Sequence, residues 1–425
     1  MKFLVVGGGK IGLPLACQIA SRGGNVTVGD IRPDVVEAIT AGVAPFDEPG
    51  MSAILAANVE RGRLTATLDI TAAARESDGI IIVVPALITP DHDIDLGNLI
   101  AASRDVAKGL RQGVVVAYET TMAVGNTRNQ LVPVLEESGL KAGSDFHVCF
   151  SPERVKSRHI FEFLGITPKV VGGIDEAAAA AGERMYRTYV SDTVINIGSL
   201  EAAEFVKLSG MVYRDVNIAL ANELATYAEA AGLDVWRVFA AANSDNETSM
   251  LFPGIGVGGH CTPVYPYFLI RDGERRDIPQ HLVTLARAIN ESQPARAIER
   301  LSLALGGLAT RKVHILGLGF RPDVKEHIYS PAFPLARQLV EAGAKVTLED
   351  MLYRDDEIRA HGFTPATIAD AAPEAIILNT AHASFAQPDF AAWRARGGRV
   401  VFDGRALWSR AEVEAAGLAY LCVGR

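Results

Sequence analysis

The chain has 425 residues, of which 49% are hydrophobic and 21% are charged, a composition typical of globular protein with room for two or three domains. Its formal net charge is −9 and its sequence pI is about 5.6. With no run of lysine and arginine, these values do not suggest a nucleic-acid-binding or anionic-membrane-binding surface, and they favour chemistry on a small molecule.

The start of the chain and its cysteines bear on its location. Six residues lead directly into Gly7, too few for a signal peptide, and no apolar run reaches membrane-spanning length. We therefore expect a cytoplasmic protein without a membrane partner. The four cysteines, Cys17, Cys149, Cys261 and Cys422, show no C-x-x-C spacing. They predict free thiols, with neither a disulfide framework nor a metal site.

The first motif is a glycine-rich turn between an expected strand, residues 3–6, and an expected helix, residues 13–22. Its glycines follow the G-x-G-x-x-G pattern of turns that receive a pyrophosphate at a helix N-terminus. A second strand, residues 25–28, leads to Asp30, where a carboxylate accepts hydrogen bonds from a free ribose. This favours NAD over NADP, although Arg32 keeps NADP open. The structural alternative is a glycine turn that binds nothing.

Further strands are expected at residues 79–84, 113–118 and 146–150, alternating with helical stretches such as 98–110 and 127–138. This alternation is typical of a parallel, doubly wound sheet, whose ligands bind at the carboxyl ends of the strands. Three segments leave those ends: Val84-Pro85-Ala86-Leu87, residues 119–127 with Thr121, and Ser151-Pro152-Glu153-Arg154-Val155. Their polar groups are candidate site residues, and plain loop capping is the alternative.

A long helical pattern without proline runs from Leu200 to Ala231. Such a helix often joins two α/β domains and supplies a dimer face. Lys207, Met211 and Arg214 fall at i, i+4 and i+7 and therefore share one side of it. A lysine in this position is more often a solvated charge than a catalyst.

The stretch from Pro253 to Phe268 contains four glycines in six residues and then His260 and Cys261. Thr262 is expected to cap a helix with Pro263 in its first position, which would leave Cys261 beside a positive helix N-terminus. That setting favours a thiolate. The alternative is a small buried hydrophobic residue, the usual role of a lone cysteine.

The C-terminal third repeats the strand and helix order of the N-terminal third. Strands are expected at residues 312–316, 345–348, 375–378 and 399–402, with a helix at 331–342 and Asp403-Gly404-Arg405 after the last strand. The fold class is α/β, with two Rossmann-like doubly wound domains joined by a central helical region. We expect domains at residues 1–198, 199–305 and 306–425, the second with the cysteine loop.

Together these motifs make the chain resemble the UDP-glucose/GDP-mannose dehydrogenase family over nearly its whole length. They are Gly7 to Gly12, Thr121 to Thr127, Ser151 to Val155, Lys207 with residues 214–223, Gly256 to Cys261, and Asp403 to Arg405. The Ser-Pro-Glu-Arg-Val and Gly-Gly-His-Cys forms look like the branch acting on UDP-N-acetylmannosamine or UDP-N-acetylglucosamine.

The resemblance implies oxidation of a hexose C6 alcohol to a carboxylate with two NAD in succession, because a thiol adduct of the aldehyde can lose the second hydride. It implies that Cys261 is the nucleophile, that Lys207 stabilises the oxyanion, and that Glu153 and Thr121 hold the lysine and water. The residues expected to bind NAD are Gly7, Gly9, Lys10, Ile11, Gly12, Asp30, Arg32, Val84, Pro85, Thr121 and Glu153. Those expected to bind the nucleotide sugar are Glu153, Arg154, Val155, Lys207, Arg214, Gly258, His260, Phe320, Arg321 and Arg405. Family habit also implies a homodimer through the central helix.

Three positions depart from the family pattern. Met211 stands where the family has an asparagine, Tyr265 where it has an aspartate, and Ile328 where it has an arginine. Val84-Pro85-Ala86-Leu87 also replaces a Val-Pro-Thr-Pro tract. We expect a remodelled site that takes an atypical sugar or nucleotide linkage, with neutral drift as the alternative. Two other hypotheses stay open: an oxidation that stops at the aldehyde, and a non-catalytic nucleotide-sugar-binding homologue.

Overall fold

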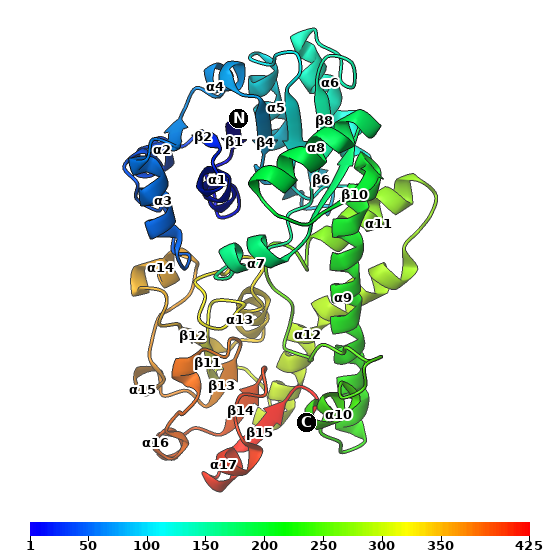
Figure 1. The fold of residues 1–425 in the computed structure, drawn as a ribbon. Helices are drawn as coiled ribbons and strands as arrows, with labels where there is room; N and C mark the ends of the chain where they lie inside the picture. The colour runs from blue at the N-terminus through cyan, green and yellow to red at the C-terminus, as the bar shows by residue number, and fades with distance from the viewer. The chain divides into compact units, whose positions relative to one another are not determined.

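The computed structural model describes residues 1–425 and divides into two compact units, unit 1 and unit 2. Unit 1 comprises Met1–Gly210 and Tyr267–Ile278, and unit 2 comprises Met211–Pro266 and Pro279–Arg425. Two of the three boundaries between the units lie inside helices: α9 (Leu200–Ala230), the long green helix of Figure 1, and α11 (Tyr265–Arg275). The three expected domain ranges stay a prediction.

Unit 1 is built on an eight-stranded sheet in the order β10-β9-β8-β7-β4-β1-β2-β3. Its strands are β1 (Lys2–Val6), β2 (Asn25–Gly29), β3 (Leu64–Thr67), β4 (Gly79–Ile82), β7 (Val115–Tyr118), β8 (His147–Phe150), β9 (Lys169–Gly173) and β10 (Val194–Ser199). Residues of β1 alternate between two hydrophobic clusters, with Phe3 and Val5 in one and Leu4 and Val6 in the other. Both faces of this strand are therefore buried, as expected of a central strand in a doubly wound sheet.

Helices and short elements of unit 1 connect these strands. They are α1 (Gly12–Ser21), α2 (Pro33–Thr40), α3 (Met51–Glu60), α4 (Ile70–Glu76), α5 (Gly97–Ala107), the π-helix η1 (Thr127–Leu131), α6 (Val132–Leu135), the 3₁₀ helix η2 (Glu136–Ser138), α7 (Ile160–Ile166), α8 (Glu176–Tyr189) and the hairpin β5 (Leu87–Ile88) and β6 (Ile94–Asp95). The helix expected at 127–138 thus begins as a π turn, a form that is frequent at functional sites.

The strands expected from the sequence pair in parallel, and the sheet reverses direction only where a strand that was not expected joins it. β8 and β9 run antiparallel, with Cys149 opposite Gly173 and Phe150 opposite Gly172. The chain between them holds only the short helix α7, and β9 was not expected from the sequence. β9 and β10 pair in parallel and extend the sheet beyond this reversal.

Unit 2 contains a five-stranded parallel sheet in the order β12-β11-β13-β14-β15. Its strands are β11 (Lys312–Leu316), β12 (Lys345–Glu349), β13 (Ala375–Leu378), β14 (Val400–Asp403) and β15 (Ala419–Cys422). Its other helices are α10 (Val235–Ala242), α12 (His281–Leu305), α13 (Ala332–Glu341), α14 (Asp355–Ala360), α15 (Ile368–Ala371), η3 (Ala383–Phe385), α16 (Phe390–Ala395) and α17 (Arg410–Ala415). The second Rossmann-like arrangement is confirmed.

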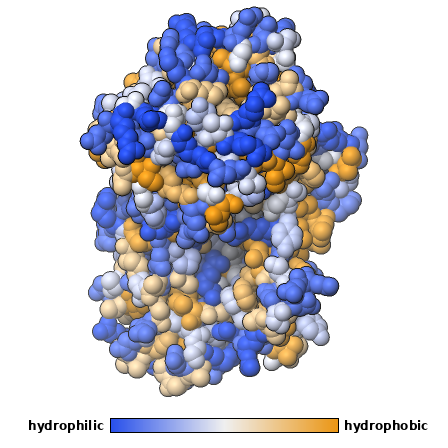
Figure 2. All heavy atoms as spheres, in the orientation of Figure 1, coloured by the Kyte–Doolittle hydropathy of each residue, from blue (hydrophilic) through white to orange (hydrophobic).

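The surface mixes hydrophilic and hydrophobic side chains on the face drawn in Figure 2. Among the helices of the protein, none combines the length and the apolar character that crossing a membrane requires.

Candidate functional site

The glycine turn in unit 1 lies between β1 and α1 and is closely packed. A Cβ atom on Gly12 would stand 1.9 Å from the Gly7 carbonyl oxygen, so that position admits only glycine. A Cβ on Gly9 would meet nothing within 4 Å, so that backbone is open to a ligand. Helix α1 then begins without a side-chain cap and without an acidic residue in its first turn. Its N-terminal amides, which follow Lys10 and Ile11, therefore suit the pyrophosphate of a dinucleotide.

Asp30 follows β2 and is held against this turn. Its Oδ2 accepts a hydrogen bond from the Gly8 amide at 2.7 Å, and its Oδ1 accepts one from the Arg32 amide at 2.9 Å. The Arg32 guanidinium instead pairs with Asp34. A carboxylate fixed beside the turn, with the nearby cation already paired, fits the free ribose diol of NAD better than a 2′-phosphate.

The segments after β4 and β7 are tied to each other and to α9. The Thr120 hydroxyl donates to the Val84 carbonyl oxygen at 2.6 Å, which fixes the tract that continues into Pro85. Thr121 is buried, with 4% of its surface exposed. The loop ends on Glu204 of α9, whose carboxylate accepts from the Gly125 amide at 2.5 Å and from the amide and hydroxyl of Thr127 at 2.9 and 2.6 Å.

Glu204 was not among the residues expected from the sequence. It lies three positions before Lys207 on the same helix, and the sequence held no signal for it beyond its place in the long helical pattern. Burial raises the pKa of Glu204 to about 7, against the opposing effect of its hydrogen bonds with Thr127 and Gly125. Its function in the structure is to hold the loop that carries Thr121.

The loop Ser151–Val155 presents Glu153 in an unexpected orientation. The Glu153 carboxylate turns inward, where Oε1 accepts from the amides of Arg154 and Val155 at 2.5 and 2.8 Å and Oε2 accepts from Lys169 at 3.2 Å. Lys207 Nζ instead donates to the main-chain carbonyl of Glu153. The structure therefore brings Glu153 and Lys207 together, but through the backbone of Glu153.

In unit 2, Cys261 differs from the other cysteines in its exposure. Cys17, Cys149 and Cys422 are buried, whereas Cys261 is partly exposed. Burial raises the pKa of the Cys17 and Cys422 thiols to about 12 and raises that of Cys149 further. Cys261 is therefore the one thiol of the protein that is open to a ligand.

The expected start of the helix after Cys261 is wrong. Helix α11 begins at Tyr265, and the amides of Val264 and Tyr265 donate to the Cys261 carbonyl at 3.2 and 2.9 Å. Pro263 and Pro266 have no N–H group to donate, and the Cys261 carbonyl accepts both of these hydrogen bonds. Thr262 is therefore not the cap of the helix. Cys261 still precedes the N-terminal end of α11, which begins at Tyr265 and not at the expected Pro263.

The glycines before Cys261 are required by an aromatic ring. A Cβ on Gly258 would lie 2.5 Å from Phe320 Cβ, and one on Gly259, which has φ +103°, would lie 2.9 Å from the ring. The Gly259 amide also donates to the Ile328 carbonyl at 2.9 Å. On the other side, Arg405 donates to the carbonyls of Asn379 and Gly256 at 2.7 and 3.4 Å. The cysteine loop is thus braced by two loops of the C-terminal sheet.

A buried polar network supports the same loop from the helices of unit 2. Arg287 of α12 donates to Asp215 Oδ1 of α9 at 2.7 Å and to the Thr262 carbonyl at 3.4 Å. Asn290 donates to Asp215 Oδ1 at 2.8 Å, and Asn222 accepts from the Gly254 amide at 3.0 Å. Arg287 and Asp215 are 3% and 0% exposed. Sequence analysis placed Asp215 in a motif but did not anticipate Arg287.

Comparisons with known proteins agree with this geometry along the chain. Residues 1–190 match the NAD binding domain of the UDP-glucose/GDP-mannose dehydrogenase family, residues 201–292 match its central domain, and residues 314–410 match its UDP binding domain. The chain belongs to this family. It is an NAD-dependent nucleotide-sugar dehydrogenase, and its substrate is a nucleotide sugar.

Individual relatives of this dehydrogenase point to the expected branch. The UDP-N-acetyl-D-mannosamine dehydrogenase of Pyrococcus horikoshii is 33% identical over 413 residues, with 95% of each chain covered. The NDP-N-acetyl-D-galactosaminuronic acid dehydrogenase of Ralstonia solanacearum is 29% identical over 419 residues, with 95% of this chain and 96% of the relative covered. A solved structure of the Pyrococcus horikoshii UDP-D-ManNAc dehydrogenase matches with a TM-score of 0.89 at 31% identity and covers 100% of this chain and 99% of that chain. The resemblance seen in the sequence is confirmed.

The roles of the other expected site residues stay predictions, and the structure gives their positions. His260 and Arg214 are exposed in unit 2, and Phe320 and Arg321 are partly buried there. The three residues that depart from the family pattern, Met211, Tyr265 and Ile328, are all partly buried and all belong to unit 2.

Proposed function

We propose that the dehydrogenase oxidises the C6 alcohol of a nucleotide-linked hexose to the uronate in two successive steps. Bound NAD supplies the hydride acceptor for each oxidation. The observation that carries this proposal is the exposure of Cys261, because an aldehyde can lose a second hydride only after a nucleophile has added to it. The three other thiols are buried and cannot reach a substrate.

The proposed steps use residues of this chain in defined roles. The C6 hydroxyl loses a proton and a hydride to give the aldehyde, and the Cys261 thiolate adds to its carbonyl carbon. Loss of the second hydride leaves a thioester, which water cleaves to the carboxylate and the free thiol. Lys207 would stabilise the oxyanions of these steps. Its ammonium group has three donors and is positioned by the Glu153 carbonyl, to which it donates.

Thr121 and Glu153 are proposed to complete the machinery. Thr121 is buried on the loop that Glu204 holds, which gives its hydroxyl a fixed place for binding water or cofactor. The Glu153 carboxylate accepts three hydrogen bonds within its own unit. We therefore propose that the Glu153 side chain positions the loop and that its main-chain carbonyl positions Lys207.

The substrate is proposed to differ from the common nucleotide sugars. The carbonyl of Ile328 binds the Gly259 amide, so residue 328 is next to the cysteine loop, and there the family supplies a cation for a phosphate. A charge-assisted hydrogen bond of this kind contributes about 1.5 to 3 kcal/mol. Met211 and Tyr265 replace polar groups in the same unit. An altered sugar or nucleotide linkage would account for the three changes together.

Counting NADH per sugar tests the reaction. Purified enzyme with NAD and a panel of UDP- and GDP-sugars should give two NADH for each sugar consumed, and Cys261→Ser should form no carboxylate. One NADH per sugar would instead support the alternative that oxidation stops at the aldehyde. Tyr265 favours this alternative, because a tyrosine phenol is protonated at neutral pH and is then a far weaker base than the ionised aspartate of the family.

The substrate proposal has its own test. UDP-glucose, UDP-N-acetylmannosamine and GDP-mannose should each give a kcat/KM below about 10⁴ M⁻¹s⁻¹, the bottom of the usual range for enzymes. A higher value for any of them would refute the proposal of an atypical substrate and leave the two-step oxidation intact.

We further propose that the enzyme is a homodimer through α9. Tyr213, Leu220, Leu224 and Tyr227 repeat at intervals of seven, four and three residues and so form one stripe along this helix. They are 61%, 47%, 37% and 70% exposed, which is a large apolar surface for one helix to leave in water. Sedimentation equilibrium should show a dimer that Tyr227→Glu weakens, and a monomeric wild-type enzyme would refute this.

A further inference from the structure

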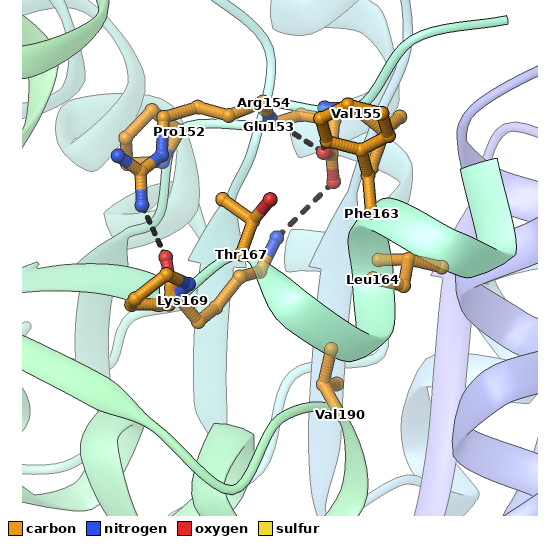
Figure 3. A pocket seen from close by; sticks show the side chains of 10 residues that line it. Pro152, Glu153, Arg154, Val155, Phe163, Leu164, Thr167, Lys169 and Val190 are labelled. Atoms are coloured by element: carbon orange, nitrogen blue, oxygen red, sulfur yellow. Dashed lines mark hydrogen bonds and ion pairs between the residues drawn. The ribbon is translucent and has the colours of Figure 1, made fainter. Parts of the chain in front are cut away.

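A buried cluster of charged residues lies beneath the loop that carries Glu153. Lys169, the first residue of β9, is 6% exposed, and its Nζ donates to Glu119 Oε2 at 2.6 Å and to Glu153 Oε2 at 3.2 Å. The Tyr186 hydroxyl donates to Glu119 Oε1 at 2.7 Å. Figure 3 shows Lys169 reaching the inward-facing carboxylate of Glu153 from the opposite wall of a small pocket. None of the proposed chemical steps uses Lys169, Glu119 or Tyr186.

Stability alone gives little reason for this cluster. Removing a lysine and two carboxylates from water costs several kcal/mol per ion, and well-packed apolar residues of similar volume are often as stabilising or more so. Burial would raise the pKa of Glu153, but the charges of Lys169 and Lys207 outweigh it and hold that pKa below its usual range. The carboxylate of Glu153 is therefore kept charged and pointed inward by Lys169.

The orientation of that carboxylate determines the course of the loop. With Oε2 held by Lys169, Oε1 receives the next two amides of the chain, those of Arg154 and Val155. The Arg154 guanidinium closes the turn by donating to the carbonyl of Pro168, the residue before Lys169 (Figure 3). The Glu153 carbonyl is thereby left facing Lys207 Nζ, which donates to it.

We propose that Lys169 is a positioning residue for Lys207, acting through Glu153. By anchoring the Glu153 side chain, Lys169 fixes the carbonyl that holds the Lys207 ammonium group. This inference rests on the proposed role of Lys207. A displacement of about 1 Å in a catalytic group can cost on the order of 10²-fold in rate, so loss of the anchor should be visible in turnover.

The test is a double-mutant cycle between Lys169→Met and Lys207→Met. Lys169→Met should lower kcat at least tenfold with little change in the KM for NAD, and Lys169→Arg should restore part of it. In the Lys207→Met background, Lys169→Met should have no further effect on kcat, since the group that it places is gone. Lys141→Met is the control, because Lys141 belongs to the same unit and pairs with Glu136 at the surface, 68% exposed. It should leave kcat unchanged.

The outcomes separate this inference from the proposed function. Wild-type kcat in Lys207→Met would refute the proposed role of Lys207. If Lys169→Met kept the wild-type kcat while Lys207→Met was inactive, only the positioning role of Lys169 would be refuted. Equal effects of Lys169→Met on kcat in the two backgrounds would refute that role as well. If Lys169→Met does not fold, Lys169→Gln, whose amide can still donate to one carboxylate, is measured in the same cycle. Equal effects of Lys169→Gln on kcat in the wild-type and Lys207→Met backgrounds would also overturn the inference.

Discussion

Replacing Arg287 by methionine should destabilise unit 2 strongly, because the change leaves the Asp215 carboxylate buried without its cation. Asp215 is 0% exposed, and its Oδ1 keeps only the Asn290 amide at 2.8 Å once Arg287 is removed. Removing one partner of a buried ion pair costs about 3 to 5 kcal/mol. With a denaturant dependence of about 3 kcal/mol per molar urea, the midpoint should fall by about 1 to 2 M.

Tryptophan fluorescence measures the shift of the urea midpoint in unit 2. The three tryptophans, Trp236, Trp393 and Trp408, all belong to unit 2, so the transition that they report is that of unit 2. Arg359→Met is the matched control, because Arg359 pairs with Asp355 at the surface, where the side chains are 61% and 71% exposed. It should change the free energy of unfolding by less than about 0.5 kcal/mol.

The effect of Arg287→Met should depend on pH. Burial raises the pKa of Asp215 even with Arg287 and Asn290 lowering it, so loss of the arginine raises it further. A raised folded-state pKa means that the protonated carboxyl is favoured in the fold, and stability is lost as pH rises through that pKa. The difference in stability between variant and wild type should therefore narrow as pH falls through the raised pKa of Asp215 in the variant. A gap below about 1 kcal/mol, or one that does not vary with pH, would refute this reasoning.

Three other predictions concern unit 1. Glu204→Gln should destabilise it by about 1 to 3 kcal/mol in urea denaturation followed by circular dichroism, because an amide nitrogen would face the Gly125 amide and leave a buried donor unpaired; an unchanged midpoint would contradict it. Burial raises the pKa of Glu119 to about 7 against the opposing charge of Lys169, so the contribution of this carboxyl to stability should be lost as pH rises from about 4.5 to 7. Hydrogen exchange of the β7 and β8 amides should show this loss in the wild type and a smaller one in Glu119→Gln, and equal losses would refute it. Specificity measured as kcat/KM should favour NAD over NADP by at least about tenfold, or roughly 1.4 kcal/mol, because of Asp30, and equal use of the two would defeat this assignment.

The sequence by itself determined the parts that local backbone demands specify. The turn Gly7 to Gly12 needs glycine because Gly12 leaves no room for a side chain beside Gly7. Apolar runs bounded by turns located the core strands, and Lys312–Leu316 and Ala375–Leu378 agree with the structure residue for residue. The glycine turn, the motifs around Cys261 and Lys207 and the other short motifs together identified the family. These features depend on residues that are close together in the chain.

Only the tertiary structure decided which distant charges meet. Lys169 and Glu119 are 50 positions apart, and Arg287 and Asp215 are 72 apart, so neither pair has a local signal. The last two strands on one side of the sheet, β9 and the edge strand β10, were missed because β9 is a short run containing two glycines and most of β10 is exposed. The Glu153 carboxylate turns inward because the buried Lys169 ammonium group donates to it. A charge removed from water needs a partner of opposite charge. The sequence could indicate that Glu153 matters, but the contacts of its carboxylate and carbonyl depended on the packing of β8 and β9.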